Sequence, residues 1–162
     1  MENSIILQKI NEKITTGILS VDETIDILTV VVDKDVIYPL VEFLKDELGF
    51  IFLTDVCGIH IPTQTAELGV IYHLHNLSEN KRIRLKVFVT KAAPYVASIT
   101  NLFSGANWME RETFDFYGVN FVGHPNLTRI LNVEYMNYHP MRKEYPLEDA
   151  TREDKDDKFF GR

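Results

Sequence analysis

A chain of 162 residues, 45% of them hydrophobic and 25% charged, has the length of one domain and the composition of a globular protein, which excludes a mostly disordered chain. Its formal net charge of -7 excludes an electrostatic attraction to nucleic acid or to an anionic membrane surface. The apolar runs are far shorter than the roughly 20 residues of a membrane helix, and the amino terminus lacks a secretory signal, so we expect a cytoplasmic protein without a membrane span.

The first third of the chain predicts two helices and one buried strand. Isoleucines recur at helical spacing over residues 4–16, and Gly17 stands where that helix would end. The apolar residues between 24 and 32 predict a strand that is buried on both faces. Pro39 suits the first turn of a second helix, whose apolar stripe ends at Gly49.

Three strands are predicted next, at residues 50–57, 69–77 and 81–90. The residues Ser-Glu-Asn at 78–80 provide a hairpin turn between the last two. In the strand at 81–90 apolar residues alternate with residues that are mostly basic. Since successive side chains of a strand point to opposite faces, this strand has one apolar and one basic face.

Two helical pieces follow the strands. Ser98 or Thr100 is placed to cap a short helix that reaches Phe103. A second helix spans residues 108–117 and ends at Gly118. The predicted strands follow one another without intervening helices, which favours an α+β fold, a mainly antiparallel sheet with helices packed on it, over a doubly wound one.

The helical and strand periodicity is lost after Leu131. We therefore expect an α+β domain over residues 1–131 and an extended C-terminal tail over residues 132–162. Residues 144–162 hold seven acidic and four basic side chains and no apolar stripe. Such a segment needs another surface to order it.

The last predicted helix carries side chains that suit acid–base chemistry. Arg111 and Asp115 are four residues apart, so an ion pair between them is expected. Glu112 and Asp115 are three apart, and with His124 downstream the two carboxylates suit general acid and base roles. The alternative is a charged helix face that docks on a loop through Arg111 and Arg129.

Histidine and cysteine residues offer other kinds of site. His73 and His75 form a His-x-His motif on one strand face, so a shared metal ion is an alternative, although no third ligand stands at an obvious spacing. Cys57 is the only cysteine, and its apolar neighbours favour packing over a reactive thiol. Iron–sulfur clusters usually need four cysteine ligands, or histidine in place of two, and this chain cannot supply that set.

Two motifs stand in order near the end of the chain. The first comprises Trp108, Glu110-Arg111-Glu112, Phe114 to Val119, Phe121, Gly123-His124-Pro125, Leu127 and Arg129 to Leu131. The second is His139-Pro140-Met141-Arg142-Lys143-Glu144-Tyr145-Pro146. Together they closely resemble the signature and the downstream motif of the C subunit of NADH-quinone oxidoreductase, respiratory complex I.

The resemblance implies a cofactor-free structural subunit of the peripheral arm of a proton-translocating NADH:quinone oxidoreductase. Such a chain is not catalytic by itself, and FMN, iron–sulfur clusters and quinone are expected in partner subunits. The implied partners are the D subunit of complex I and other peripheral-arm subunits such as B, on the cytoplasmic side of the inner membrane. The motif residues then become candidates for contacts with partners: Glu110, Arg111, Glu112, Asp115, His124, Arg129, His139, Arg142 and Lys143.

Two alternatives stay open. The first is the equivalent subunit of a ferredoxin-linked or coenzyme F420-linked dehydrogenase or of a membrane-bound hydrogenase, because donor specificity resides in other subunits. The second is a small acid/base enzyme that uses Glu112, Asp115 and His124. That enzyme requires the three side chains to line an accessible cleft, and salt bridges to Arg111 and Arg129 would contradict it.

Overall fold

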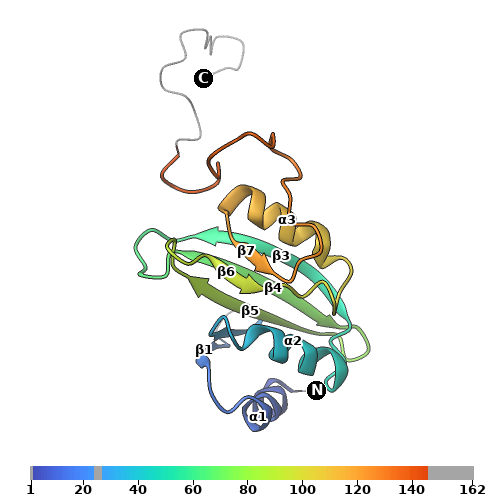
Figure 1. The fold of residues 1–162 in the computed structure, drawn as a ribbon. Coiled ribbons are helices and arrows are strands. Elements are labelled where there is room, and N and C mark those ends of the chain that lie inside the picture. The colour runs from blue at the N-terminus through green and yellow to red at the C-terminus, as the bar shows by residue number, and fades with distance from the viewer. Residues whose placement is uncertain (1, 24–26, 146–162) are drawn as a thin grey trace, which may run out of the picture.

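A five-stranded sheet with helices on one of its faces forms the body of the molecule (Figure 1). The computed structural model describes residues 2–23 and 27–145. In chain order the elements are α1 (Asn3–Lys13), β1 (Ile18–Asp22), β2 (Leu28–Val32), α2 (Ile37–Asp46), β3 (Phe52–His60), β4 (Leu68–Asn76), β5 (Lys81–Val89), β6 (Tyr95–Ala97), α3 (Ala106–Tyr117) and β7 (Asn120–Val122).

The strand order in the main sheet is β1-β2-β5-β4-β3. Neighbouring strands are antiparallel except β2 and β5, which run parallel. A parallel pair needs a long crossover, and here the chain forms α2, β3 and β4 before it returns in β5. β6 and β7 form a separate two-stranded parallel sheet. The prediction of an α+β fold with a mainly antiparallel sheet is confirmed.

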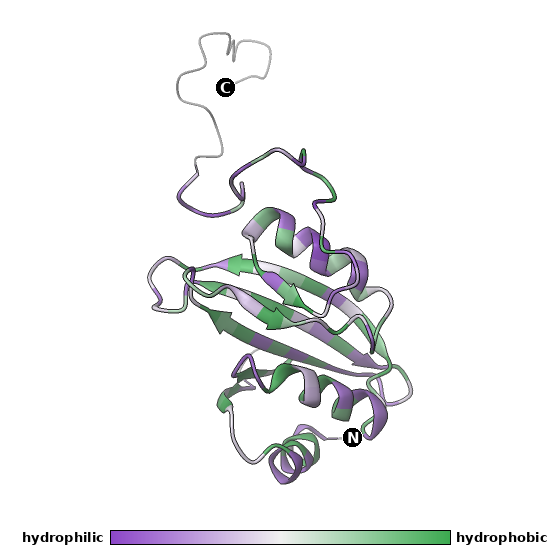
Figure 2. Cartoon of the chain, in the orientation of Figure 1, coloured by the Kyte–Doolittle hydropathy of each residue, from purple (hydrophilic) through white to green (hydrophobic). Residues whose placement is uncertain are grey.

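β5 shows how the sequence decides which face of the sheet is buried. Ile83 and Leu85 are completely buried, whereas Arg82, Arg84 and Lys86 alternate with them. Because alternate side chains share a face, the sheet has an inner face that carries the core and an outer face that carries these cations. Figure 2 shows the alternation as hydrophobic and hydrophilic bands along the strand.

Helix α2 covers the inner face with a continuous apolar stripe. Leu40, Val41 and Leu44 have no exposed surface, because residues at this spacing lie on one side of a helix. Pro39 lies in the first turn of α2, as predicted. Ile6 and Ile10 of α1 join the same core.

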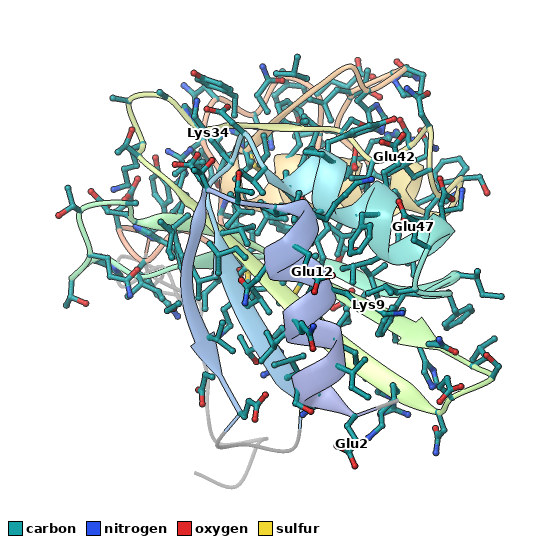
Figure 3. The ribbon with its side chains drawn as sticks, turned by 90° about the horizontal axis from the view of Figure 1, so that it is seen from below. Glu2, Lys9, Glu12, Lys34, Glu42 and Glu47 are labelled. Carbon is teal, nitrogen blue, oxygen red and sulfur yellow. The ribbon has the colours of Figure 1, made fainter. Side chains whose placement is uncertain are left out.

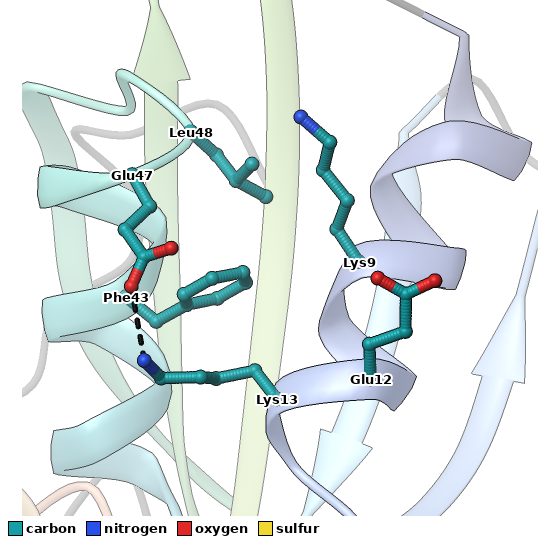
Figure 4. A pocket seen from close by; sticks show the side chains of 6 residues that line it. All are labelled: Lys9, Glu12, Lys13, Phe43, Glu47 and Leu48. Atoms are coloured by element: carbon teal, nitrogen blue, oxygen red, sulfur yellow. Dashed lines mark hydrogen bonds and ion pairs between the residues drawn. The ribbon is translucent and has the colours of Figure 1, made fainter.

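A surface groove separates α1 from α2. Lys13 of α1 forms an ion pair with Glu47 at 3.0 Å, and its ammonium lies 5.6 Å from the ring centre of Phe43. Figure 3 shows Lys9 and Glu12 on the same side of α1, and Figure 4 shows the groove from close by. These exposed contacts join the two helices at the surface and contribute little to stability.

The structure corrects several predicted elements. The sequence predicts no strand at β1, β6 or β7: β1 is an edge strand with little burial on either side, and the other two have three residues each. The helix predicted to reach Phe103 is wrong, because the chain there forms turns in which the N–H groups of Leu102 and Phe103 both donate to the carbonyl of Ile99.

Other element boundaries differ more modestly. α1 ends at Lys13, four residues before Gly17, which has a φ of +91° in the connection to β1. β2 begins at Leu28 and is buried on both faces as predicted, while residues 24–26 of that prediction lie outside the described residues. Among residues 2–23 and 27–145 no helix is both long and apolar enough to cross a membrane.

The chain after β7 has no helix or strand up to residue 145. Most of the predicted acidic tail, residues 146–162, lies outside the described residues. The division into a domain over residues 1–131 and a tail over residues 132–162 stays a prediction.

Candidate functional site

Helix α3 carries two acidic residues on its buried side. Glu110 and Asp115 are both 0% exposed. The helix ends at Gly118, as predicted, and this glycine has a φ of +73°, the left-handed conformation that commonly terminates helices. Since a buried carboxylate must be paired, hydrogen-bonded or protonated, the surroundings of each one determine its role.

Glu110 binds the turn that follows β6. Its carboxylate accepts hydrogen bonds from the Ser98 hydroxyl at 2.7 Å and from the Ile99 N–H at 2.8 Å. Burial raises the pKa of Glu110 to about 7, although both hydrogen bonds act to lower it. Burial and the charge of Glu110 also raise the pKa of Tyr72, whose buried hydroxyl has no hydrogen-bond partner among the described residues. Glu110 therefore ties α3 to the core of the domain.

Asp115 organises the chain that follows β7. One carboxylate oxygen accepts the N–H groups of Ile130, Leu131 and Asn132 at 3.1, 2.9 and 2.9 Å, and the other pairs with Arg129 at 2.6 Å. Burial alone would raise the pKa of Asp115, but these donors outweigh it and hold the pKa well below its usual range. We call Asp115, Arg129 and the backbone of residues 130–132 the Asp115 anchor.

Arg129 extends this anchor further along the chain. Its guanidinium also donates to the carbonyl of Asp115 at 2.9 Å and to the carbonyls of Met136 and Tyr138 at 2.8 Å each. A guanidinium suits this role because its donors point in several fixed directions. The hydrogen bonds of this one side chain thus hold residues 129–138 in place around it.

Arg111 does not form the predicted ion pair with Asp115. It donates instead to the carbonyls of Thr128 and Arg129 at 3.1 and 3.0 Å. Asp115 is buried, whereas Arg111 is partly exposed and binds the loop through its backbone carbonyls. The helical spacing of four residues therefore predicts the wrong partner, although both arginines do fix the loop.

The second His-Pro motif caps the end of α3. The ring Nδ1 of His139 lies 3.0 Å from the Asp115 carbonyl, and Arg142 donates to the Tyr117 carbonyl at 2.8 Å. The last carbonyls of a helix have no partners within it, so these contacts satisfy them. Gly118 is required here, because a Cβ would collide with the side chains of His139 and Arg142.

A second set of contacts holds residues 143 and 144 against the sheet. The buried ring of His60 accepts the N–H of Lys143 at 2.8 Å through Nδ1, so its Nε2 carries the proton and faces Glu67 at 3.2 Å. Lys91 pairs with both Glu67 and Glu144. We call these residues the His60 anchor; the sequence does not single out His60 because it lies 83 residues from Lys143.

The proposed acid–base trio does not assemble. Asp115 is buried among donors, and Glu112 is exposed. His124 accepts the N–H of Asn126 at 3.0 Å and lies 3.1 Å from the carbonyl of Asn107, so its Nε2 is the donor. Asp115 is held by Arg129, and the three side chains share no cleft. The geometry contradicts the acid–base enzyme.

Of the two histidines in the His-x-His motif, His73 has a hydrogen-bond partner, whereas the buried Nε2 of His75 has none among the described residues. Arg84 donates to Nε2 of His73 at 2.8 Å, which occupies that lone pair. The described residues contain no grouping of three or more His, Cys, Asp or Glu side chains placed to hold a metal ion. Cys57 is half-buried in β3, and burial, then Asp55, raises the pKa of its thiol to about 11. This thiol is a poor nucleophile near neutral pH.

Between the two anchors the chain presents apolar side chains to solvent. Tyr135 is 88% exposed and Leu131 is 68% exposed. Trp108 on α3 is exposed beside Arg111, whose guanidinium lies 5.5 Å from the indole. The exposed apolar set comprises Val133, Tyr135, Tyr138 and Met141 between the anchors, Leu131 within the Asp115 anchor, Tyr145 directly after the His60 anchor and Trp108 on α3. We call this set the apolar ridge.

Most of the predicted contact residues therefore make contacts within the chain. The side chains that do so belong to Glu110, Arg111, Asp115, His124, Arg129, His139 and Arg142. Glu112 is exposed, and Lys143 uses its backbone N–H. The role of these residues toward a partner stays a prediction. The geometry itself shows that they shape the segment that carries the apolar ridge.

These features define an α+β domain whose last helix holds an irregular C-terminal segment through buried charges. Residues 30–151 match the family described as respiratory-chain NADH dehydrogenase, 30 Kd subunit. The NADH-quinone oxidoreductase C subunit of Citrifermentans bemidjiense is 38% identical over 152 residues, which is 94% of each chain. The chain belongs to this 30 Kd subunit family.

Two solved structures share the fold. The trypsin-resistant fragment (1-134) of Nqo5 is 28% identical with a TM-score of 0.68, and the match covers 78% of this chain and 100% of that one. A chain of the membrane-bound sulfane sulfur reductase, an archaeal respiratory membrane complex, has a TM-score of 0.76. That match covers 91% of this chain and 87% of the other, but at 20% identity it shows the fold alone.

Proposed function

We propose that this chain is a structural subunit in the peripheral arm of a proton-translocating NADH:quinone oxidoreductase and that it holds no redox cofactor itself. Membership of the 30 Kd subunit family supports the assembly. The observation that carries the structural role is the use of the motif residues. Most of the polar motif residues form hydrogen bonds that fix the segment of the apolar ridge.

The apolar ridge is the part of this chain that a neighbouring subunit would cover. Exposed aromatic side chains such as Tyr135 supply much of the binding energy of interfaces once they are buried. The anchors hold the ridge in place before binding, which reduces the entropy lost when the partner docks. The chain then contributes a preformed surface, and its neighbours contribute the chemistry.

The partners we propose are the D subunit and other peripheral-arm subunits such as B. FMN, the iron–sulfur clusters and quinone would be held by these neighbours. We propose that the chain is attached peripherally, on the cytoplasmic side of the inner membrane. The described helices are consistent with attachment through other subunits, since none of them is suited to span a bilayer.

The experiment is purification of a tagged chain from native membranes in a mild detergent, with partners identified by mass spectrometry. We expect subunits of an NADH-oxidising, quinone-reducing complex, including D and B. Recovery of a ferredoxin-linked or coenzyme F420-linked dehydrogenase, or of a hydrogenase, would replace the proposed complex with a related one. A chain recovered alone would contradict the structural role.

A matched pair of variants tests the apolar ridge in the same preparation. Tyr135→Ser removes an exposed aromatic from the ridge, and Leu77→Ser removes an exposed apolar residue, 54% accessible, beyond the end of β4. We expect Tyr135→Ser to weaken assembly by about 30-fold, the loss typical of a residue worth about 2 kcal/mol at an interface. Leu77→Ser should assemble normally. Equal assembly of both variants would exclude the ridge as the docking surface.

A further inference from the structure

The outer face of the five-stranded sheet carries cations that neither anchor uses. The strand register places Arg82 beside His75, Arg84 beside His73 and Lys86 beside Ile71. All six side chains lie on the face opposite the buried residues of β4 and β5. The basic face of β5 that the sequence predicts thus lies beside the His-x-His motif of the neighbouring strand, β4.

None of the described helices packs on this outer face. α2, α3 and the β6–β7 pair lie against the other face, where the core is found (Figure 1). The outer side chains of β4 and β5 accordingly keep partial exposure, whereas their inner neighbours keep almost none. An antiparallel sheet can leave one face exposed to water, but the side chains on that face are usually a mixture of polar types.

The cations of this face are only partly balanced by residues that the structure describes. Arg84 donates to Nε2 of His73 at 2.8 Å, so the ring proton is on Nδ1, which faces Asp55 at 3.7 Å. Arg82 and Lys86 form no hydrogen bond or ion pair with the described residues. The acidic residues of this face, Asp55 and Asp22, stand on the two edge strands. The positive charge of this face is therefore concentrated on β5 in the middle of the sheet, although the chain as a whole has a net charge of -7.

Apolar side chains lie among these cations. Phe88 and Ile71 are partly exposed on the same face, and Phe52 of the edge strand is 48% exposed. A surface of this composition, with cations around aromatic and aliphatic groups, matches a protein partner better than a phosphate backbone or a lipid surface, which would need a wider basic area. Three cations on one face of a single strand favour a partner that presents carboxylates.

We propose that this outer face, through Arg82, Arg84 and Lys86, binds an acidic segment of a neighbouring subunit in the same assembly. The proposal rests on the proposed function, because the assembly supplies the partner. It gives the protein a second contact surface, on the opposite side of the sheet from the elements that carry the anchors. The three cations meet carboxylates, while Phe88 and Ile71 meet apolar groups.

The test uses the assembly purified from native membranes, and Lys86 is the probe. A carbodiimide couples a lysine to a carboxylate in direct contact, and peptide mass spectrometry identifies the linked residues. We expect a link between Lys86 and an Asp or Glu of another subunit. Acetylation of Lys86 should be about tenfold slower in the assembly than in the isolated chain, with Lys9 of α1 as the comparison site.

Matched charge reversals complete the test. Lys86→Glu should reduce incorporation of the chain by about tenfold or more, because it sets a carboxylate against carboxylates. Lys9→Glu makes the same change of charge on the exposed side of α1 and should incorporate normally. A Lys86 that reacts equally in the assembly and in isolation would overturn the inference and leave the proposed function intact.

Three other outcomes also decide the question. Normal incorporation of Lys86→Glu would exclude an acidic partner. Binding of the isolated chain to vesicles of phosphatidylcholine and phosphatidylserine, abolished by Lys86→Glu, would replace the protein partner with a lipid surface. A chain found in no assembly at all would overturn both this inference and the proposed function.

Discussion

Replacement of Asp115 by Asn tests the Asp115 anchor most sharply. Asn keeps the shape but supplies one acceptor oxygen where the carboxylate has two, and its amide group would face donors from Arg129 or from residues 130–132. Removal of one partner from a buried ion pair costs about 3–5 kcal/mol. Since about 1.4 kcal/mol corresponds to a tenfold change, the equilibrium for release of this segment should rise by about 100-fold or more.

Amide hydrogen exchange of the isolated chain measures this release residue by residue. In Asp115→Asn the N–H groups of Ile130, Leu131 and Asn132 should exchange about 100-fold faster, while those of β4 and β5 stay protected. Glu112→Gln, which changes an exposed carboxyl on the same helix, should leave all of them unchanged. Unchanged exchange at residues 130–132 in Asp115→Asn would show that the Asp115 carboxylate does not hold this segment.

Three further changes have defined outcomes. Burial raises the pKa of Glu110 from 4.5 to about 7, so its contribution to stability is complete below pH 4.5 and is lost as the pH rises from there through 7. The free energy of urea unfolding of the wild type should fall by about 2.5 kcal/mol between pH 5 and pH 8, and Glu110→Gln should show a much smaller fall. In Gly118→Ala the new Cβ is strained at a φ of +73° and collides with His139 and Arg142, so the free energy of unfolding should fall by about 2 kcal/mol. An unchanged denaturation midpoint would contradict this expectation. His60→Phe removes the acceptor for the Lys143 N–H, so hydrogen exchange of that amide should accelerate about fivefold or more. An unchanged exchange rate would show that the His60 anchor does not hold the segment.

The sequence predicts the parts of this fold that depend on local periodicity. The alternation in β5 identifies both its buried side and its basic side, and the stripe of α2 identifies the helix that covers the sheet. The edge strand β1 has no such alternation, because it is exposed on most of its residues. The sequence also cannot show that β2 pairs with β5, which is a consequence of tertiary packing.

In the candidate site, too, sequence patterns do not reveal which partners single residues contact in the folded chain. Helical spacing predicts an Arg111–Asp115 pair, but burial turns Asp115 toward Arg129 and the following backbone. Three backbone N–H groups on one oxygen leave no trace in the sequence, because any residue type can supply them. The role of His60 is hidden for a related reason, since its partner is the N–H of a distant residue.

We propose that the motif residues fix a segment for docking and do no chemistry. The measurement is the ratio of this chain to the D subunit, its proposed partner, in assemblies purified from membranes of cells that express wild type, Glu112→Gln or Asp115→Asn. We expect about equal amounts of the two proteins for wild type and Glu112→Gln, and at least a tenfold deficit of this chain for Asp115→Asn while its sheet remains protected from exchange. Full incorporation of Asp115→Asn with a released segment would show that docking does not depend on the fixed segment.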